Sequence, residues 1–190
     1  MAEVVEPTII FLVGFMGAGK TTVGRELARV LGWSFVDLDA RIEAKQGKNI
    51  AQIFAHQGEI EFRKLETHAL RELLGSSDPE DPEEEPEPMV VALGGGAFPQ
   101  EINRQLIRER GGRVVYLEVE LKEAMRRCEQ TKLTRPLLSD EKLTAELMET
   151  RRPFYEIADL RVRTDGQLVD EIVQKICLQL GLTPCRQEAE

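Results

Sequence analysis

A glycine-rich stretch with a lysine and two threonines stands near the start of the chain, where residues 14–24 read GFMGAGKTTVG. Gly14, followed after four residues by Gly19, Lys20 and Thr21, matches the pattern of a phosphate-binding loop. Backbone N–H groups of such a loop, with the positive end of a following helix, would hold a polyphosphate. Lys20 would reach the terminal phosphates and the Thr21 hydroxyl would ligate magnesium. An ordinary glycine-rich turn is the simpler alternative, but the flanking strand-like and helix-like sequences favour the phosphate loop.

Two aspartates, Asp37 and Asp39, lie at the end of the apolar segment WSFVDLD. Because one residue separates them, their side chains point in the same direction if strand geometry persists. Beside a triphosphate, one carboxylate could hold magnesium and the other could accept the proton of an attacking hydroxyl. The runs VVAL and VVYLEV contain no aspartate, so this segment is expected to supply the metal ligand. As an alternative that is compatible with these roles, Asp39 could cap a helix that begins with ARIEAK.

Three consecutive glycines, Gly94, Gly95 and Gly96, follow another apolar run in VVALGGGA. They remove every side chain at a place where a ligand could approach the backbone. A tight turn is the simpler explanation, but three glycines exceed what a turn needs. We therefore expect close contact between this turn and a ligand.

Arginines occur at three further places in the sequence: Arg63, Arg135, and the pair Arg151 and Arg152. A guanidinium group suits bidentate recognition of a carboxylate or a phosphate, and such charges stabilise the transition state of phosphoryl transfer. Their spacing alone does not assign these roles. Glu66 could hold Arg63 in place, although an exposed i,i+3 ion pair is the simpler interpretation.

The elements that must position these residues follow an alternating strand and helix pattern, which is typical of an α/β fold. We expect five parallel strands at residues 8–13, 33–39, 89–96, 112–119 and 159–164. Helices are expected at residues 20–31, 58–74, 99–109, 121–129, 141–151 and 168–180, covering both faces of the sheet. In such sheets ligands bind beyond the carboxyl ends of the strands, where the candidate residues lie.

Length and composition favour one domain spanning residues 1–190, with a core at about 8–182 and a C-terminal tail at 183–190. The chain carries 34 acidic and 25 basic residues, a net charge of −9. Seven of the acidic residues lie in a proline-rich segment, 78–88, which is expected to be a solvated surface loop. The remaining 27 acidic residues nearly balance the 25 basic ones, so nothing indicates a nucleic-acid-binding surface.

The three cysteines, Cys128, Cys177 and Cys185, lack the spacing of a metal site, and an odd number does not suit a disulfide framework. This favours a reducing, cytoplasmic location. The sequence offers neither a targeting signal nor an apolar run of membrane-spanning length. We therefore expect no membrane role.

Taken together, the motifs resemble those of the shikimate kinases, from about Thr8 to Leu182. Six segments carry the resemblance in order: GFMGAGKTTVGRELA, FVDLDARIE, GEIEFRKLE, ALGGGA, RPLL and RRPFYEIAD. The resemblance implies a three-layer P-loop kinase fold with a mobile lid at about 128–138. It also implies transfer of the ATP γ-phosphoryl group to the 3-hydroxyl of shikimate, a step of chorismate and aromatic amino-acid synthesis.

The resemblance assigns the nucleotide site as well. The phosphates would be bound by Gly17, Ala18, Gly19, Lys20, Thr21 and Thr22. Thr21 would ligate Mg²⁺, with Asp37 nearby and acting through water. Arg135 would come from the lid and reach the phosphates, with Arg127 and Pro136 near the adenine and Gln167 at the adenine loop.

The resemblance likewise assigns the shikimate site. Asp39 would bind shikimate hydroxyls and is placed to act as the base, so Asp39, Lys20 and Arg135 are the expected catalytic residues. Arg63 and Arg151 would hold the substrate carboxylate. The turn Gly94, Gly95 and Gly96 would contact the substrate, with the Gly95 backbone at a hydroxyl.

Two other interpretations remain open from the residues. Another small-metabolite kinase, such as a gluconate kinase, would share the phosphate loop, the lid and the arginines. A nucleotide-binding regulatory protein would have kept the fold without transfer, but the chain retains Lys20, Asp39, Arg63 and Arg151. ATP and shikimate are the expected partners, and the chain is expected to act as a monomer.

Overall fold

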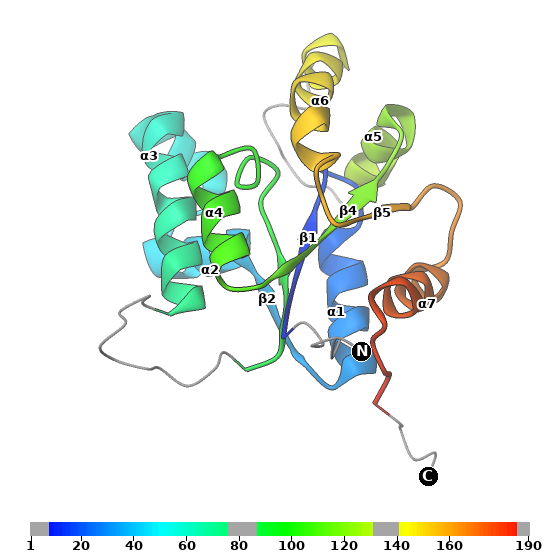
Figure 1. Cartoon of the computed structure of the whole chain (residues 1–190). Helices are drawn as coiled ribbons and strands as arrows, with labels where there is room; N and C mark the ends of the chain where they lie inside the picture. The colour runs from blue at the N-terminus through cyan, green and yellow to red at the C-terminus, as the bar shows by residue number, and fades with distance from the viewer. Residues whose placement is uncertain (1–7, 76–86, 131–140, 186–190) are drawn as a thin grey trace.

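The computed structural model describes residues 8–75, 87–130 and 141–185, which form a central sheet flanked by helices (Figure 1). The sheet has five strands, all parallel, in the order β2-β3-β1-β4-β5. Their bounds are β1 Ile9–Val13, β2 Ser34–Asp37, β3 Met89–Ala92, β4 Arg113–Glu118 and β5 Leu160–Arg163. The expected five-stranded parallel sheet is confirmed.

The apolar runs form strands because both faces of the sheet are covered. Every residue of β1 and β3 is buried, and β1 lies at the centre of the sheet. The edge strands β2 and β5 are only partly buried, which agrees with their more polar sequences, SFVD and LRVR.

Seven helices lie within the described residues. Their bounds are α1 Lys20–Leu31, α2 Leu38–Gln46, α3 Ile50–Leu74, α4 Glu101–Glu109, α5 Leu121–Gln130, α6 Glu141–Tyr155 and α7 Val169–Leu180. The connections β1 to β2 and β3 to β4 cross the sheet in opposite directions, so right-handed crossovers place α1 and α4 on opposite faces. Helix α7 packs against α1, and α3 packs against α2 and α4 (Figure 1). None of the helices described here is long and apolar enough to cross a membrane.

Several expected boundaries are wrong. Strand β3 ends at Ala92 rather than residue 96, because a tight turn begins at Gly94, and α6 continues to Tyr155 rather than ending at residue 151.

Two further differences have a local cause. The second strand ends at Asp37 rather than residue 39, because Asp37 caps α2, which begins at Leu38. Helix α3 begins at Ile50 rather than residue 58, because Asn49 and Gln52 form a capping box that starts it earlier.

Gly58 divides α3 into two helical segments. Its dihedral angles, φ 79° and ψ 172°, are not helical and lie in a region that is nearly restricted to glycine. The expected helix, which began at Gly58, therefore corresponds to the second segment. This break sets the direction of the segment that carries Arg63 and Glu66.

The topology places a switch point at β1. This strand pairs with β3 on one side and β4 on the other, and the glycine-rich loop follows it. Open α/β sheets bind ligands at such points, beyond the carboxyl ends of the strands. Residues 78–86 of the expected acidic loop and 186–190 of the expected tail lie outside the described residues.

We expect Gly58→Ala to lower the free energy of unfolding by about 1–3 kcal/mol, because alanine must adopt these dihedral angles. Gly47→Ala is a matched control, since Gly47 (φ 61°, ψ 22°) likewise has nothing within 4 Å of the position that a Cβ atom would occupy, but lies in the left-handed helical region. Alanine there should cost only about 1 kcal/mol. Urea denaturation measures both, and equal losses would contradict the special strain at Gly58.

Candidate active site

The glycine-rich loop is pressed against the end of β4 and the start of α5. Gly14 (φ 140°), Gly17 (φ 76°) and Gly19 (φ 92°) all have positive φ angles, which favour glycine. A Cβ atom on Gly14 would lie 2.5 Å from the carbonyl oxygen of Leu117, and one on Gly17 would lie 2.5 Å from that of Ala124. Glycine is therefore required here for close packing as well as for backbone conformation.

The N-terminus of α1 is suited to an anion. Gly19 is its N-cap and supplies no side-chain hydrogen bond, and the first turn contains no acidic residue. The first N–H groups and the positive end of the helix dipole are therefore not neutralised by a cap. Lys20 Nζ lies over the loop and donates to the carbonyl oxygens of Gly14 at 2.9 Å and Phe15 at 3.0 Å. Ala18, a residue of the loop itself, is fully buried.

Thr21 and Asp37 lie together at this end of α1. Thr21 Oγ1 donates to Asp37 Oδ2 at 2.8 Å, and Thr22 is exposed beside it. The other oxygen of Asp37 accepts a hydrogen bond from the Ala40 backbone N–H at 3.2 Å, which makes Asp37 the N-cap of α2. The alternative in which Asp39 caps this helix is therefore wrong. Because the strand ends at Asp37, the two aspartates belong to different elements.

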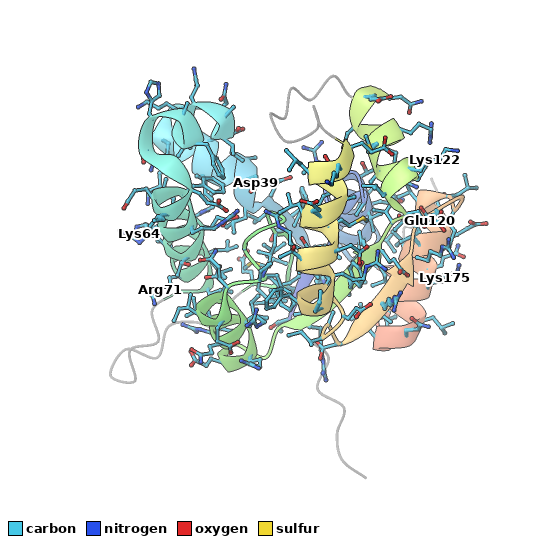
Figure 2. All side chains as sticks on the ribbon, turned by 90° about the horizontal axis from the view of Figure 1, so that it is seen from above. Asp39, Lys64, Arg71, Glu120, Lys122 and Lys175 are labelled. Atoms are coloured by element: carbon cyan, nitrogen blue, oxygen red, sulfur yellow. The ribbon has the colours of Figure 1, made fainter. Side chains whose placement is uncertain are left out.

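Asp39 lies on α2 and points toward the glycine triplet. In the view from above in Figure 2, Asp39 lies toward the centre of the molecule, whereas Lys64 and Arg71 lie toward the outside of the molecule. A Cβ atom on Gly94 would overlap Asp39 Oδ1 and would lie 2.7 Å from Glu66 Oε1. Two carboxylates from α2 and α3 thus converge on one glycine.

The other two glycines accommodate arginines in the same way. A Cβ atom on Gly96 would overlap Arg63 Nη1, and one on Gly95 would lie 3.1 Å from Arg151 Nη1. A backbone hydrogen bond from Ala97 to the carbonyl oxygen of Gly94 at 3.0 Å also makes the segment a tight turn. Three glycines are needed in succession because polar side chains of the protein itself occupy the space beside the turn.

Arg63 is held by carboxylates on its own helix. It donates to Glu66 Oε2 at 2.6 Å and to Glu59 Oε1 at 2.7 Å. Glu66 is fully buried, so the interpretation of an exposed ion pair is wrong. Burial raises the pKa of Glu66 to about 7 and Asp39 adds to this effect, while the charge and hydrogen bond of Arg63 oppose it. Gln100 also donates to Glu66 Oε2, at 3.1 Å.

Two phenylalanines of α3 complete the surroundings of this guanidinium. Arg63 lies over the rings of Phe54 and Phe62, 5.9 and 5.5 Å from their centroids. The two rings are in contact, with centroids 4.7 Å apart. Phe54 comes from the helical segment before Gly58 and Phe62 from the segment after it, so the break in α3 brings an apolar wall beside the arginine.

Arg151 reaches the turn from α6. In the described part of the chain it forms no ion pair within 4.0 Å of a carboxylate, unlike Arg63 and its own neighbour Arg152. Tyr155, one helical turn further on, donates from its hydroxyl to the carbonyl oxygen of Gly95 at 2.5 Å. Two arginines and two carboxylates therefore surround one glycine turn, brought together from α2, α3 and α6.

Arg127 joins the phosphate loop to the segment after β5. Its guanidinium donates to the carbonyl oxygen of Gly17 at 3.3 Å and to that of Thr164 at 2.9 Å, and Glu123 pairs with it at 2.8 Å. Gln167, expected at an adenine loop, follows Thr164; its amide donates to the carbonyl oxygen of Arg163. Arg127 thus links the phosphate loop to the segment that leads to Gln167.

The remaining expected residues, Arg135 and Pro136, lie outside the described residues, as do residues 131–138 of the expected lid. The motifs of the sequence assigned no role to Phe54, Gln100 or Tyr155. Tyr155 stands inside the segment RRPFYEIAD, so its place in a motif was visible, but its contact with the distant Gly95 was not.

The site as a whole combines two chemistries. The loop and the open end of α1 can bind a polyphosphate, and the nearby hydroxyl and carboxylate of Thr21 and Asp37 are oxygen ligands of the kind that magnesium prefers. The glycine turn gathers arginines that can bind a carboxylate and an aspartate that can bind a hydroxyl. Such an arrangement suits phosphoryl transfer to a small acid.

Comparison with known proteins agrees with this geometry. The family model described as shikimate kinase matches residues 16–181. The shikimate kinase of Chlorobium chlorochromatii (strain CaD3) is 44% identical over 186 residues, covering 90% of this chain and 92% of that protein. The structure of a shikimate kinase from Acinetobacter baumannii in complex with shikimate has a TM-score of 0.80 and 40% identity, covering 93% of this chain and 94% of that chain.

A structure of a gluconokinase from Sinorhizobium meliloti 1021 is also similar, with a TM-score of 0.62 and 22% identity over 93% of each chain. At that identity the likeness concerns the fold alone. The match to the family model over most of the chain, together with relatives of about 40% identity, shows that this chain belongs to the shikimate kinase family.

Proposed function

We propose that this chain transfers the γ-phosphoryl group of ATP to the 3-hydroxyl of shikimate, yielding shikimate 3-phosphate and ADP in the synthesis of chorismate and the aromatic amino acids. Its membership of the shikimate kinase family supports this reaction. The observation that carries the proposal in this chain is the convergence of Asp39, Arg63 and Arg151 on the Gly94–Gly96 turn, across from an open phosphate loop.

The nucleotide would bind with its phosphates on the loop. The N–H groups of residues 17–22 would bind the phosphate oxygens at the positive end of α1. Lys20, which donates to carbonyl oxygens of the loop in this structure, would turn to the terminal phosphates. Arg127 and Gln167, together with Pro136, would lie near the adenine, and Arg127 already connects that region to the loop.

Magnesium would be held by Thr21 and, through water, by Asp37. Their contact at 2.8 Å supports this assignment, because a hydroxyl and a carboxylate oxygen lie together there and both suit this cation. When bound, the ion neutralises charge on the phosphate oxygens. Asp37 keeps its second oxygen on the Ala40 N–H group, and this fixes the orientation of the carboxylate.

The acceptor would bind at the glycine turn. Arg63 and Arg151 would bind its carboxylate, and the backbone of the turn, Gly95 above all, would contact a hydroxyl. Because Glu66 and Glu59 hold Arg63 in a fixed position, little side-chain entropy would be lost on binding.

In the reaction the 3-hydroxyl oxygen would form a bond to the γ-phosphorus. The bond to the bridging oxygen breaks with its electron pair, and ADP leaves. Asp39 would accept the hydroxyl proton, while Lys20 and Arg135 would stabilise the charge on the transferring group. These roles are separated in space, because Asp39 belongs to the acceptor side and Lys20 to the phosphate loop.

We also propose that the enzyme acts in the cytoplasm as a monomer. Among the described residues, Cys128, Cys177 and Cys185 form no disulfide, as is common in a reducing compartment. An assay of ADP release with shikimate, gluconate and AMP side by side tests the reaction. Equal turnover of gluconate would overturn the proposed substrate.

Asp39→Asn should lower kcat by about 10²- to 10⁴-fold, because the amide cannot accept the proton. ATP affinity should change by less than about twofold, since Asp39 lies on the acceptor side. Coupled kinetics and calorimetric titration with ATP measure the two effects. Undiminished turnover would refute the assigned role.

Replacing Arg63 or Arg151 with Lys should raise the KM for shikimate roughly tenfold or more, because an ammonium group lacks the fork of a guanidinium. The KM for ATP should stay nearly constant. Arg152→Lys is a matched control for Arg151, since Arg152 is partly exposed and pairs with Glu149 at 2.6 Å. An equal rise in both KM values would count against binding of the substrate carboxylate.

A further inference from the structure

Tyr155 is a buried residue that connects three parts of the acceptor site. It is the last residue of α6 and only 1% exposed. Its ring packs against Tyr116 of β4, with centroids 5.3 Å apart, and its hydroxyl donates to the carbonyl oxygen of Gly95 at 2.5 Å. The phenol therefore links the sheet, the helix and the glycine turn.

The same hydroxyl lies near Arg151. Both groups lie beside Gly95, since a Cβ atom there would be 3.1 Å from Arg151 Nη1 and 3.5 Å from the hydroxyl oxygen of Tyr155. Burial raises the pKa of Tyr155 and the nearby Arg151 guanidinium lowers it, so the two side chains are close enough to interact. A phenol oxygen that donates to a backbone carbonyl can also accept, so Tyr155 is placed to orient the guanidinium group as well as the turn.

The two arginines of the site are therefore held in different ways. Arg63 is bound by the carboxylates of Glu66 and Glu59, which compensate its charge. Arg151 forms no ion pair with a carboxylate among the residues described, and it lies beside a neutral phenol instead. Burial raises the pKa of Tyr155 to about 12, so the phenol stays protonated at neutral pH.

A neutral partner has a consequence for binding an anion. A carboxylate beside Arg151 would orient the guanidinium group but would also compete with the substrate for its charge. A phenol orients the group without adding negative charge. The carbonyl of Gly95, fixed by the same hydroxyl, keeps the turn in place relative to Arg151.

Building on the function proposed above, we propose that Tyr155 is a positioning residue for the acceptor. Its hydroxyl holds the Arg151 guanidinium and the Gly95 carbonyl in one fixed arrangement, so that the substrate carboxylate and a substrate hydroxyl are bound together. Tyr155 acts through these two groups and does not itself take part in phosphoryl transfer.

Tyr155→Phe tests this, because it keeps the ring and removes only the hydroxyl. The Kd for shikimate, measured by calorimetry, should rise about three- to tenfold, as expected for the loss of one or two hydrogen bonds. The Kd for ATP should change by less than about twofold. Tyr116→Phe is the matched control, since it removes a hydroxyl from the adjoining buried ring and leaves the contact between Tyr155 and Gly95 intact. This control should leave both Kd values unchanged.

A double-mutant cycle with Arg151→Met separates positioning from a merely structural role. If Tyr155 acts through Arg151, adding Tyr155→Phe to Arg151→Met should weaken shikimate binding further by less than about twofold. Fully additive losses, equal losses for ATP and shikimate, or an unchanged Kd in Tyr155→Phe would each overturn the inference. Thermal unfolding of all variants identifies any loss due to misfolding. Failure of the proposed function is recognised separately, because wild-type protein would then not phosphorylate shikimate.

Discussion

The close approach of polar side chains to the backbone of Gly94–Gly96 is the constraint on which the acceptor site depends. Asp39 and Glu66 lie against the first glycine, Arg151 against the second and Arg63 against the third. Any Cβ atom on the first or third glycine would overlap a functional group. Side chains from α2, α3 and α6 therefore all pack against this one turn, and their relative positions depend on it.

Burial of carboxylates at this turn is unfavourable, and nearby arginines of opposite charge reduce its cost. The Glu66 carboxylate is removed from water, and its raised pKa reflects the cost of its charged form. Arg63 lowers that cost at close range, and Arg151 contributes from further away. In this cluster the positive charge of Arg63 is balanced by the paired carboxylate of Glu66. Arg151 has no such paired carboxylate among the described residues, so its charge is available to a ligand.

Much of the fold could be predicted from local patterns. Five apolar runs predicted five strands, because parallel strands buried on both faces read as continuous apolar segments. Helix α2 and the first part of α3 were not assigned to definite helices, since their apolar periodicity is weak and Gly58 interrupts the pattern. The expectation that Asp37 and Asp39 point in the same direction also depended on local geometry. Asp37 caps α2 and Asp39 lies within that helix, so strand geometry does not set the directions of their carboxylates.

Short motifs were sufficient to predict the phosphate loop, the order of the elements and the set of candidate residues, because these depend on spacing within short segments. The folded molecule was needed to see that Glu66 is buried, that the glycines make room for the protein's own side chains, and that Tyr155 reaches Gly95. Those facts depend on contacts between residues far apart in the chain. Which side chains share a buried space follows from how the helices pack on the sheet, and no local pattern reveals it.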